Sequence, residues 1–135
     1  MAQARSPDEI INNPNINYFS AIPNIVDDFP LSVYAYRLYG HIVRRAGQGK
    51  NGRCFESVRS MANHCGISVG SVVKAKTELE RAHAITRKRI EGQNGNFDHD
   101  EITLVDIWEN NIQWSKISQE ERDQQIAKWR SEWGE

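Results

Sequence analysis

The sequence has little of what marks membrane, secreted or disulfide-bonded proteins. Its 135 residues contain no apolar run approaching the roughly 20 residues that span a bilayer. The opening stretch MAQARSPDEI lacks the apolar segment of a secretory signal, and the two cysteines, Cys54 and Cys65, are too few for a disulfide framework. We therefore expect a cytoplasmic protein with reduced thiols and no membrane contact. The chain length suits a single domain.

Motifs for catalysis and for metal or cofactor binding are also scarce. There is no phosphate-binding loop of the P-loop type, and no His-x-His motif accompanies the tyrosines, as a nicking initiator would need. Cys54, His64 and Cys65 lack paired zinc spacing. Residues 98–101 (DHDE) are adjacent in a Gly/Asn-rich loop and so are poorly placed to converge on one ion, while His41 lies beside apolar residues and is expected to be packed. We predict no enzyme, no cofactor and no metal site.

Charge is unevenly distributed along a chain whose formal net charge is only −1. Residues 37–90 hold twelve basic residues against three acidic ones, so this segment carries a net charge of +9. The segments on either side are acidic. A basic middle of this kind suits a polyanion such as nucleic acid, although charge alone leaves a solvated basic surface without a ligand equally open.

Apolar residues at helical spacing predict three helices in this basic middle. They run over residues 32–46, 57–65 and 68–82, and each opens on a serine that can cap the first turn. Gly66 is placed to end the second helix in a left-handed conformation. The turn of Gly66–Ser68 has the length at which two helices cross steeply, as in a helix-turn-helix.

A hairpin and a further helix are predicted after these helices. Residues 85–90 (ITRKRI) and 101–107 (EITLVDI) have strand composition, and a turn-forming loop separates them. Residues 118–121 (SQEE) have the capping-box spacing that opens a helix. The predicted fold class is mainly α with a small β-hairpin: a winged helix-turn-helix plus a C-terminal helix.

The domain organisation predicted from these elements has three parts. Residues 1–17 read as a flexible arm, residues 18–107 as the winged helix-turn-helix domain, and residues 108–135 as a C-terminal extension that holds all four tryptophans. Ile112, Trp114 and the later tryptophans either pack back on the domain or form a surface for a homodimer or another protein partner.

Five segments between Phe19 and Ile90 together carry a family pattern. They are IPN at 22–24, LS at 31–32, RLYGHIVRRAG at 37–47, GRCFES at 52–57 and MANHCGISVGSVVKAKTEL at 61–79. This stretch resembles the winged helix-turn-helix domains of phage, plasmid and replication-associated DNA-binding proteins. The resemblance implies duplex DNA as the ligand. One departure is His83, which replaces a glycine before the wing, and histidine tolerates positive φ better than most residues.

The third predicted helix would then enter the major groove with its N-terminal part. Its inward positions are Val72, Ala75 or the stem of Lys76, and Leu79. The outward positions, which we predict to contact DNA together with the capping Ser68, are Val69, Gly70, Ser71, Lys74, Thr77 and Arg81. This set lacks Arg, Asn and Gln near its start, so we expect modest sequence specificity. The alternative is that these small residues lie on a bare surface or against a partner helix.

Further predicted DNA contacts flank that helix. Arg87, Lys88 and Arg89 on the wing strand would lie along a phosphate backbone or in the minor groove. The alternative is a solvated strand that resists edge-to-edge pairing. Ser57 and Arg59, where the second helix begins, would contact the backbone. The sequence thus predicts a DNA-binding protein acting in transcriptional regulation or replication of a mobile element. The alternative is an inhibitor or adaptor of a nucleoprotein complex that keeps a helix-turn-helix scaffold.

Overall fold

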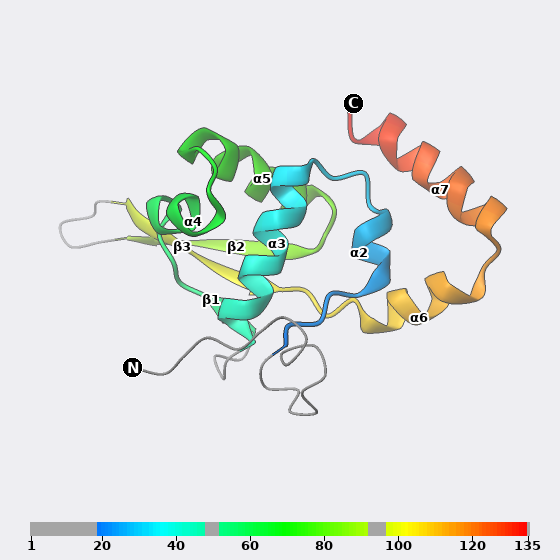
Figure 1. Ribbon diagram of the computed structural model, residues 1–135, viewed down its shortest axis with the longest axis horizontal. Coiled ribbons are helices and arrows are strands. Elements are labelled where there is room, and N and C mark those ends of the chain that lie inside the picture. Colours follow the sequence, from blue (N-terminus) through cyan, green and yellow to red (C-terminus); the bar gives the residue numbers. More distant parts are fainter. Residues whose placement is uncertain (1–18, 48–51, 92–96, 135) are drawn as a thin grey trace, which may run out of the picture.

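The structure is a computed structural model that describes residues 19–47, 52–91 and 97–134 (Figure 1). The predicted arm of residues 1–17 lies outside these ranges. The described helices are α2 (Asn24–Asp28), α3 (Val33–Ala46), α4 (Val58–Cys65), α5 (Val69–Arg81), α6 (Trp108–Lys116) and α7 (Gln119–Glu132). The described strands are β1 (Arg53–Cys54), β2 (Ile85–Glu91) and β3 (Phe97–Leu104). The predicted fold class, mainly α with a small β-hairpin, is confirmed.

Four serines cap the helices as predicted. Ser32, Ser57, Ser68 and Ser118 each accept a hydrogen bond from the backbone N–H three residues later. Such a cap satisfies one of the backbone donors that a helix start leaves without an intrahelical partner. Local sequence therefore determines where α3, α4, α5 and α7 begin.

Two residues with positive φ make the turns on either side of α5. Gly66 ends α4 with φ 70°, and its N–H donates to the carbonyl of Ala62. His83 has φ 59° in the turn that leads from α5 into β2. Both conformations agree with the prediction, and the histidine performs the turn for which glycine is the usual residue.

The sheet differs from the prediction in extent. β3 pairs antiparallel with β2 on one side and with β1 on the other, giving the order β1-β3-β2. The predicted strand over 101–107 was too late in the chain, because β3 already begins at Phe97 and ends at Leu104. Its polar start reads as loop, yet it pairs with β2 through Arg89↔Asp100 and Ile90↔His99. β1 was missed, since a two-residue strand exists only through its pairing with β3.

Helix α6 was also missed by sequence reasoning. Its first turn begins where a carboxylate oxygen of Asp106 accepts from the backbone N–H of Trp108, at 3.0 Å. That aspartate two residues ahead is the local signal that could have identified the helix start.

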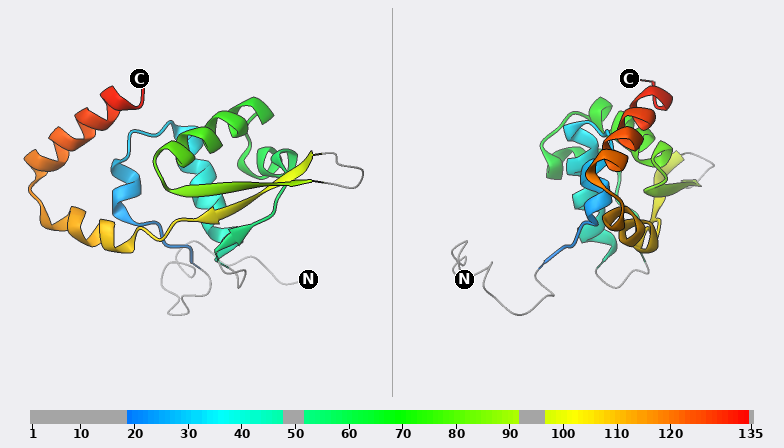
Figure 2. Two further views of the ribbon diagram at one scale, coloured as in Figure 1. Left: turned by 180° about the vertical axis from the view of Figure 1, so that it is seen from behind. Right: turned by 90° about the vertical axis from the view of Figure 1, so that its right-hand side faces the viewer.

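The core joins the three predicted helices to the sheet. α3 packs against α5 and lies across the sheet, while α4 packs against α3 and α5 (Figures 1 and 2). Among the fully buried side chains are Leu38, Ile42, Met61, Val72, Leu79, Ile85 and Ile102. Helices α6 and α7 lie at the end of the molecule opposite the one where β2 ends and β3 begins (Figures 1 and 2). Each helix in the described ranges is too short or too polar to span a lipid bilayer.

Candidate nucleic-acid interface

Helices α4 and α5 form a helix-turn-helix whose turn is held by its own backbone. The N–H of Ile67 donates to the carbonyl of Ala62 at 3.1 Å, and Ser68 then caps α5. The inward positions of α5 are those the sequence predicted, because Val72, Ala75 and Leu79 are completely buried. Burying this face leaves the opposite face of α5 toward solvent.

The residues predicted to contact DNA on α5 lie on that outward face. Ser68, Val69, Gly70, Lys74, Thr77 and Arg81 are exposed, and Ser71 is half-buried. Val73 was not predicted, although 49% of it is exposed on the same helix. Two exposed valines within a helix of 13 residues add apolar surface that can contact thymine methyl groups. Exposure places these residues where a ligand can reach them, and their contact with DNA stays a prediction.

At the start of α5 two hydroxyl groups are hydrogen-bonded to each other. The Ser68 hydroxyl oxygen accepts from the N–H of Ser71 at 3.0 Å, and the Ser68 O–H donates to the Ser71 hydroxyl oxygen at 2.9 Å. The Ser71 hydroxyl hydrogen therefore stays available to a phosphate or base acceptor. At the start of α4, the exposed Ser57 caps the helix, and Arg59 is exposed two residues further.

The three basic residues of β2 have different surroundings. Arg87 donates to a carboxylate oxygen of Glu80 at 2.8 Å and lies 3.9 Å from Asp100. The hydrogen bond from Arg87 to Glu80 is the main cause that raises the pKa of the guanidinium. The guanidinium of Arg87 thus ties β2 to α5, whereas Lys88 and Arg89 are exposed on the strand.

Polar side chains hold the buried side of α5 in place. Lys76, only 1% exposed, donates to a carboxylate oxygen of Asp100 on β3 at 3.2 Å. The prediction that only the stem of Lys76 is buried was wrong, because the charged end is buried too. Further along α5, Glu78 accepts from the backbone N–H and the hydroxyl of Ser32, at 2.8 and 2.7 Å. Together these bonds fix α5 against the hairpin and against α3.

The tryptophans of the C-terminal extension pack largely within the chain. Trp114 is buried, and its indole N–H donates to Asp28 at 2.7 Å. Trp129 stacks on Trp114 with ring centroids 5.1 Å apart and meets Phe29 edge-on at 5.2 Å. These contacts support the reading in which the extension packs back. Trp108 is 61% exposed, so a partner surface on this region stays a prediction.

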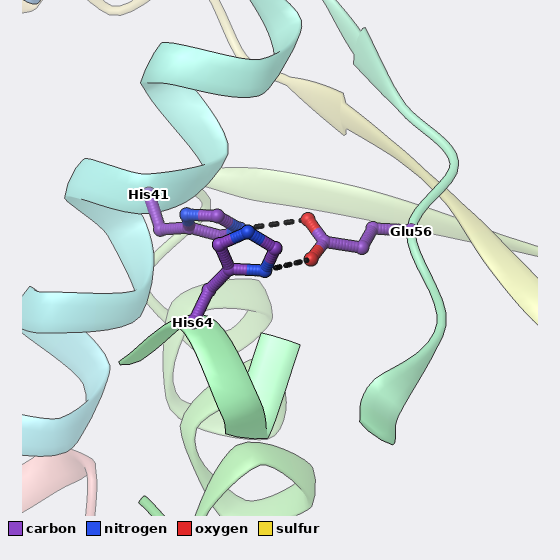
Figure 3. Close-up of side chains that lie close together, drawn as sticks. All are labelled: His41, Glu56 and His64. Carbon is purple, nitrogen blue, oxygen red and sulfur yellow. Dashed lines mark hydrogen bonds and ion pairs between the residues drawn. The ribbon is translucent and has the colours of Figure 1, made fainter. Parts of the chain in front are cut away.

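A cluster of titratable residues that the sequence did not predict lies between α3 and the first helix of the helix-turn-helix, α4. His41 on α3 and His64 on α4 point toward the carboxylate of Glu56, which precedes α4 (Figure 3). The His41 Nε2 and His64 Nδ1 atoms lie 2.7 and 3.2 Å from the two Glu56 oxygens. The imidazole rings are stacked, with centroids 5.1 Å apart.

The carboxylate of Glu56 is buried but well supplied with donors. Burial by itself would raise the pKa of Glu56, but the hydrogen bonds from Ser60 and His41 and the charge of Arg45 outweigh it and lower that pKa. No motif spacing reveals this cluster, because its three members come from different segments. The prediction for His41 holds to the extent that the ring is packed, at 6% exposure.

Comparison with known proteins agrees with this geometry. Residues 31–83 match a family model described as a helix-turn-helix domain. The match begins just before α3 and ends at the turn after α5, so it covers the two crossing helices and the helix that supports them. No curated protein matches the chain. The chain contains a helix-turn-helix domain, to which the β2–β3 hairpin and the helices α6 and α7 are joined.

Proposed function

We propose that this chain binds duplex DNA, with α5 in the major groove and the β2–β3 hairpin against the backbone, and that it acts by binding rather than by catalysis. The observation that carries the proposal is the exposed face of α5 within a matched helix-turn-helix domain. Helices in this position contact base edges with their N-terminal residues. The net charge of +9 over residues 37–90 supplies the attraction for phosphates.

The proposed contacts divide into two kinds. Ser71 and Lys74, near the start of α5, are the polar side chains that we expect to reach base edges as well as phosphates, while Gly70 allows the helix backbone to come close. The contacts expected to be made mainly to phosphates are those of Ser57, Arg59, Ser68, Arg81, Lys88 and Arg89. Because phosphate contacts position a protein but carry no sequence information, we expect moderate specificity and strong salt dependence.

The proposed cellular role is control of transcription or of replication, in a phage, a plasmid or its host. The resemblance of residues 19–90 to domains of such proteins supports this role. A homodimer would lengthen the recognised site, since two-fold symmetric helix-turn-helix proteins read two half-sites about one DNA turn apart. The exposed Trp108 gives the C-terminal region one apolar group that a second subunit can cover.

Titration of labelled duplex DNA at two salt concentrations tests the proposal. Wild type should bind with an affinity that falls as salt rises, and Lys74→Ala should bind more weakly. If Lys74 meets a phosphate, the slope of log affinity against log salt should fall by about 1. Lys128→Ala is the matched control, because Lys128 is an exposed lysine on α7.

Two results would contradict the proposal. Absence of salt-dependent binding by the wild type would reject DNA as the ligand and favour a protein-binding role for the scaffold. Equal weakening by Lys74→Ala and Lys128→Ala would reject the assignment of α5 as the groove-facing helix. Selection of bound sequences from a random duplex pool would then identify the operator.

A further inference from the structure

We propose that His41, Glu56 and His64 form a binding site for a single divalent transition-metal ion of the zinc class. Two imidazole nitrogens and a carboxylate are a ligand set that zinc uses in proteins. The ligand atoms of these three residues all lie within 4.8 Å of one another. Among the described residues, this is the one group of three or more His, Cys, Asp or Glu side chains that could hold a metal ion. The proposal does not depend on DNA binding.

The spacing of the ligand atoms suits a tetrahedral ion. Two ligands that are each about 2.1 Å from a tetrahedral zinc lie about 3.4 Å apart. The nitrogen-to-oxygen distances here are 2.7 Å for His41 and 3.2 Å for His64. With small rotations of the side chains, an ion would take the place of the His41–Glu56 hydrogen bond and of the His64–Glu56 ion pair (Figure 3). It would also replace the 3.1 Å contact between His64 Nδ1 and the Ser60 carbonyl oxygen. His64 lies in the last turn of α4 with its side chain 55% exposed, which gives an ion a way in from solvent.

The surroundings of Glu56 orient its carboxylate as metal sites require. The Ser60 hydroxyl donates to one oxygen, and Arg45 Nε lies 3.2 Å from the other. Such outer partners hold a ligand in its coordinating orientation. The guanidinium of Arg45 is a competing cation, but half of its side chain is exposed, so it can turn toward water when an ion binds. Each histidine coordinates as neutral imidazole, with its remaining proton on the ring nitrogen that does not face the ion.

The position of the site determines what an ion would do. His41 belongs to α3, Glu56 to the segment before α4, and His64 to the end of α4, two residues before the turn at Gly66. A bound ion would join these three segments and hold the first helix of the helix-turn-helix against α3. Because the ion binds the folded arrangement and not the separated ligands, occupancy should raise the melting temperature.

The test uses the full chain after removal of metal with a chelator. Zn²⁺ is titrated by calorimetry and Co²⁺ by its visible absorption, which reports nitrogen and oxygen ligands directly. We expect one ion per chain and a higher melting temperature with Zn²⁺. His64→Ala, which alters a half-exposed side chain, should lower the affinity at least about 10-fold, and Glu56→Gln should lower it as well.

His83→Asn is the matched control variant. His83 is exposed and has φ 59°, a conformation that asparagine also tolerates. This variant removes a histidine of the same domain that is not a member of the cluster, so its metal affinity should equal that of the wild type. The proposal is overturned if the wild type binds neither ion, or if His64→Ala binds them as tightly as His83→Asn does.

Discussion

The ammonium group of Lys76 lies 3.2 Å from a carboxylate oxygen of Asp100, and this ion pair joins the buried face of α5 to strand β3. The Lys76 side chain is 2% exposed and that of Asp100 is 15% exposed. A charged pair so removed from water is costly to break, because the remaining partner stays buried without compensation. The position of the hairpin relative to α5 therefore depends on this pair.

Replacing one partner of the pair should destabilise the fold strongly. We expect Asp100→Asn to lower the free energy of unfolding by about 3–5 kcal/mol, because Lys76 then remains buried as an unpaired cation. The double variant Lys76→Met/Asp100→Asn should recover most of that loss. Urea denaturation followed by circular dichroism measures both values. A loss below about 1 kcal/mol for Asp100→Asn would show that the pair does not stabilise the hairpin.

Alanine substitution should affect mainly stability at Arg87 and mainly DNA affinity at Lys88. Arg87→Ala removes the hydrogen bond to Glu80 and should cost about 1 kcal/mol of stability. Lys88 is exposed, so Lys88→Ala should leave stability within about 0.5 kcal/mol but weaken DNA binding and lower its salt slope by about 1. Parallel urea and DNA titrations separate the two effects. Equal affinity losses with unchanged stability would mean that Arg87 also meets phosphate.

Gly66→Ala should destabilise the helix-turn-helix through its backbone alone. A Cβ at this position would meet nothing within 4 Å, so there is no steric clash to relieve. The φ of 70° is the left-handed conformation, which costs an L-residue about 1–2 kcal/mol. Thermal or urea unfolding checks the value, and unchanged stability would show that the turn can adopt another conformation.

Gly70→Ala should raise stability and lower DNA affinity at the same time. Gly70 lies in the first turn of α5, and alanine is up to about 1 kcal/mol more favourable in a helix. The nearest atom to an added Cβ is the Ser68 hydroxyl oxygen at 3.9 Å, which leaves room within the protein. The methyl group would, however, keep the helix from its closest approach to DNA. Unaltered DNA affinity in this stabilised variant would place Gly70 away from the groove.

Trp129→Ala should release α7 from the rest of the chain. Trp129 meets both Phe29 and Trp114, whereas no residue of α7 is fully buried. We therefore expect reduced helicity and a red-shifted emission from the tryptophans that become hydrated. Trp108→Ala is the control, because 61% of that residue is already exposed. If both variants keep the same helicity and emission maximum, α7 is held by contacts other than this aromatic group.

Much of the helix-turn-helix was predictable because its signals are local. Ser57 and Ser68 cap helices through hydrogen bonds that reach only three residues along the chain, and Gly66 ends a helix through its own φ. The buried stripe of Val72, Ala75 and Leu79 follows from helical spacing. The outward face, and with it the candidate DNA contacts on α5, is the complement of that stripe.

The features that the sequence concealed depend on residues far apart in the chain. β1 exists because Cys54 pairs with Ile102, and Lys76 is buried to its charged end because Asp100 arrives from β3. The sequence predicts that Arg87 on the wing contacts phosphate, and it gives no sign that the Arg87 guanidinium donates a hydrogen bond to Glu80. No periodicity reports such partners, since they are brought together only by packing.

The helix-turn-helix, its caps, its left-handed turn and its basic surroundings follow from the amino-acid sequence alone, because each depends on a few neighbouring residues or on composition. Which charged side chains lie exposed to a ligand, and which are paired inside the fold, depends on how distant segments pack together. Packing also brings His41, Glu56 and His64 to one point from positions 8 to 23 residues apart along the chain. That convergence is a consequence of α4 packing against α3, which no local pattern records.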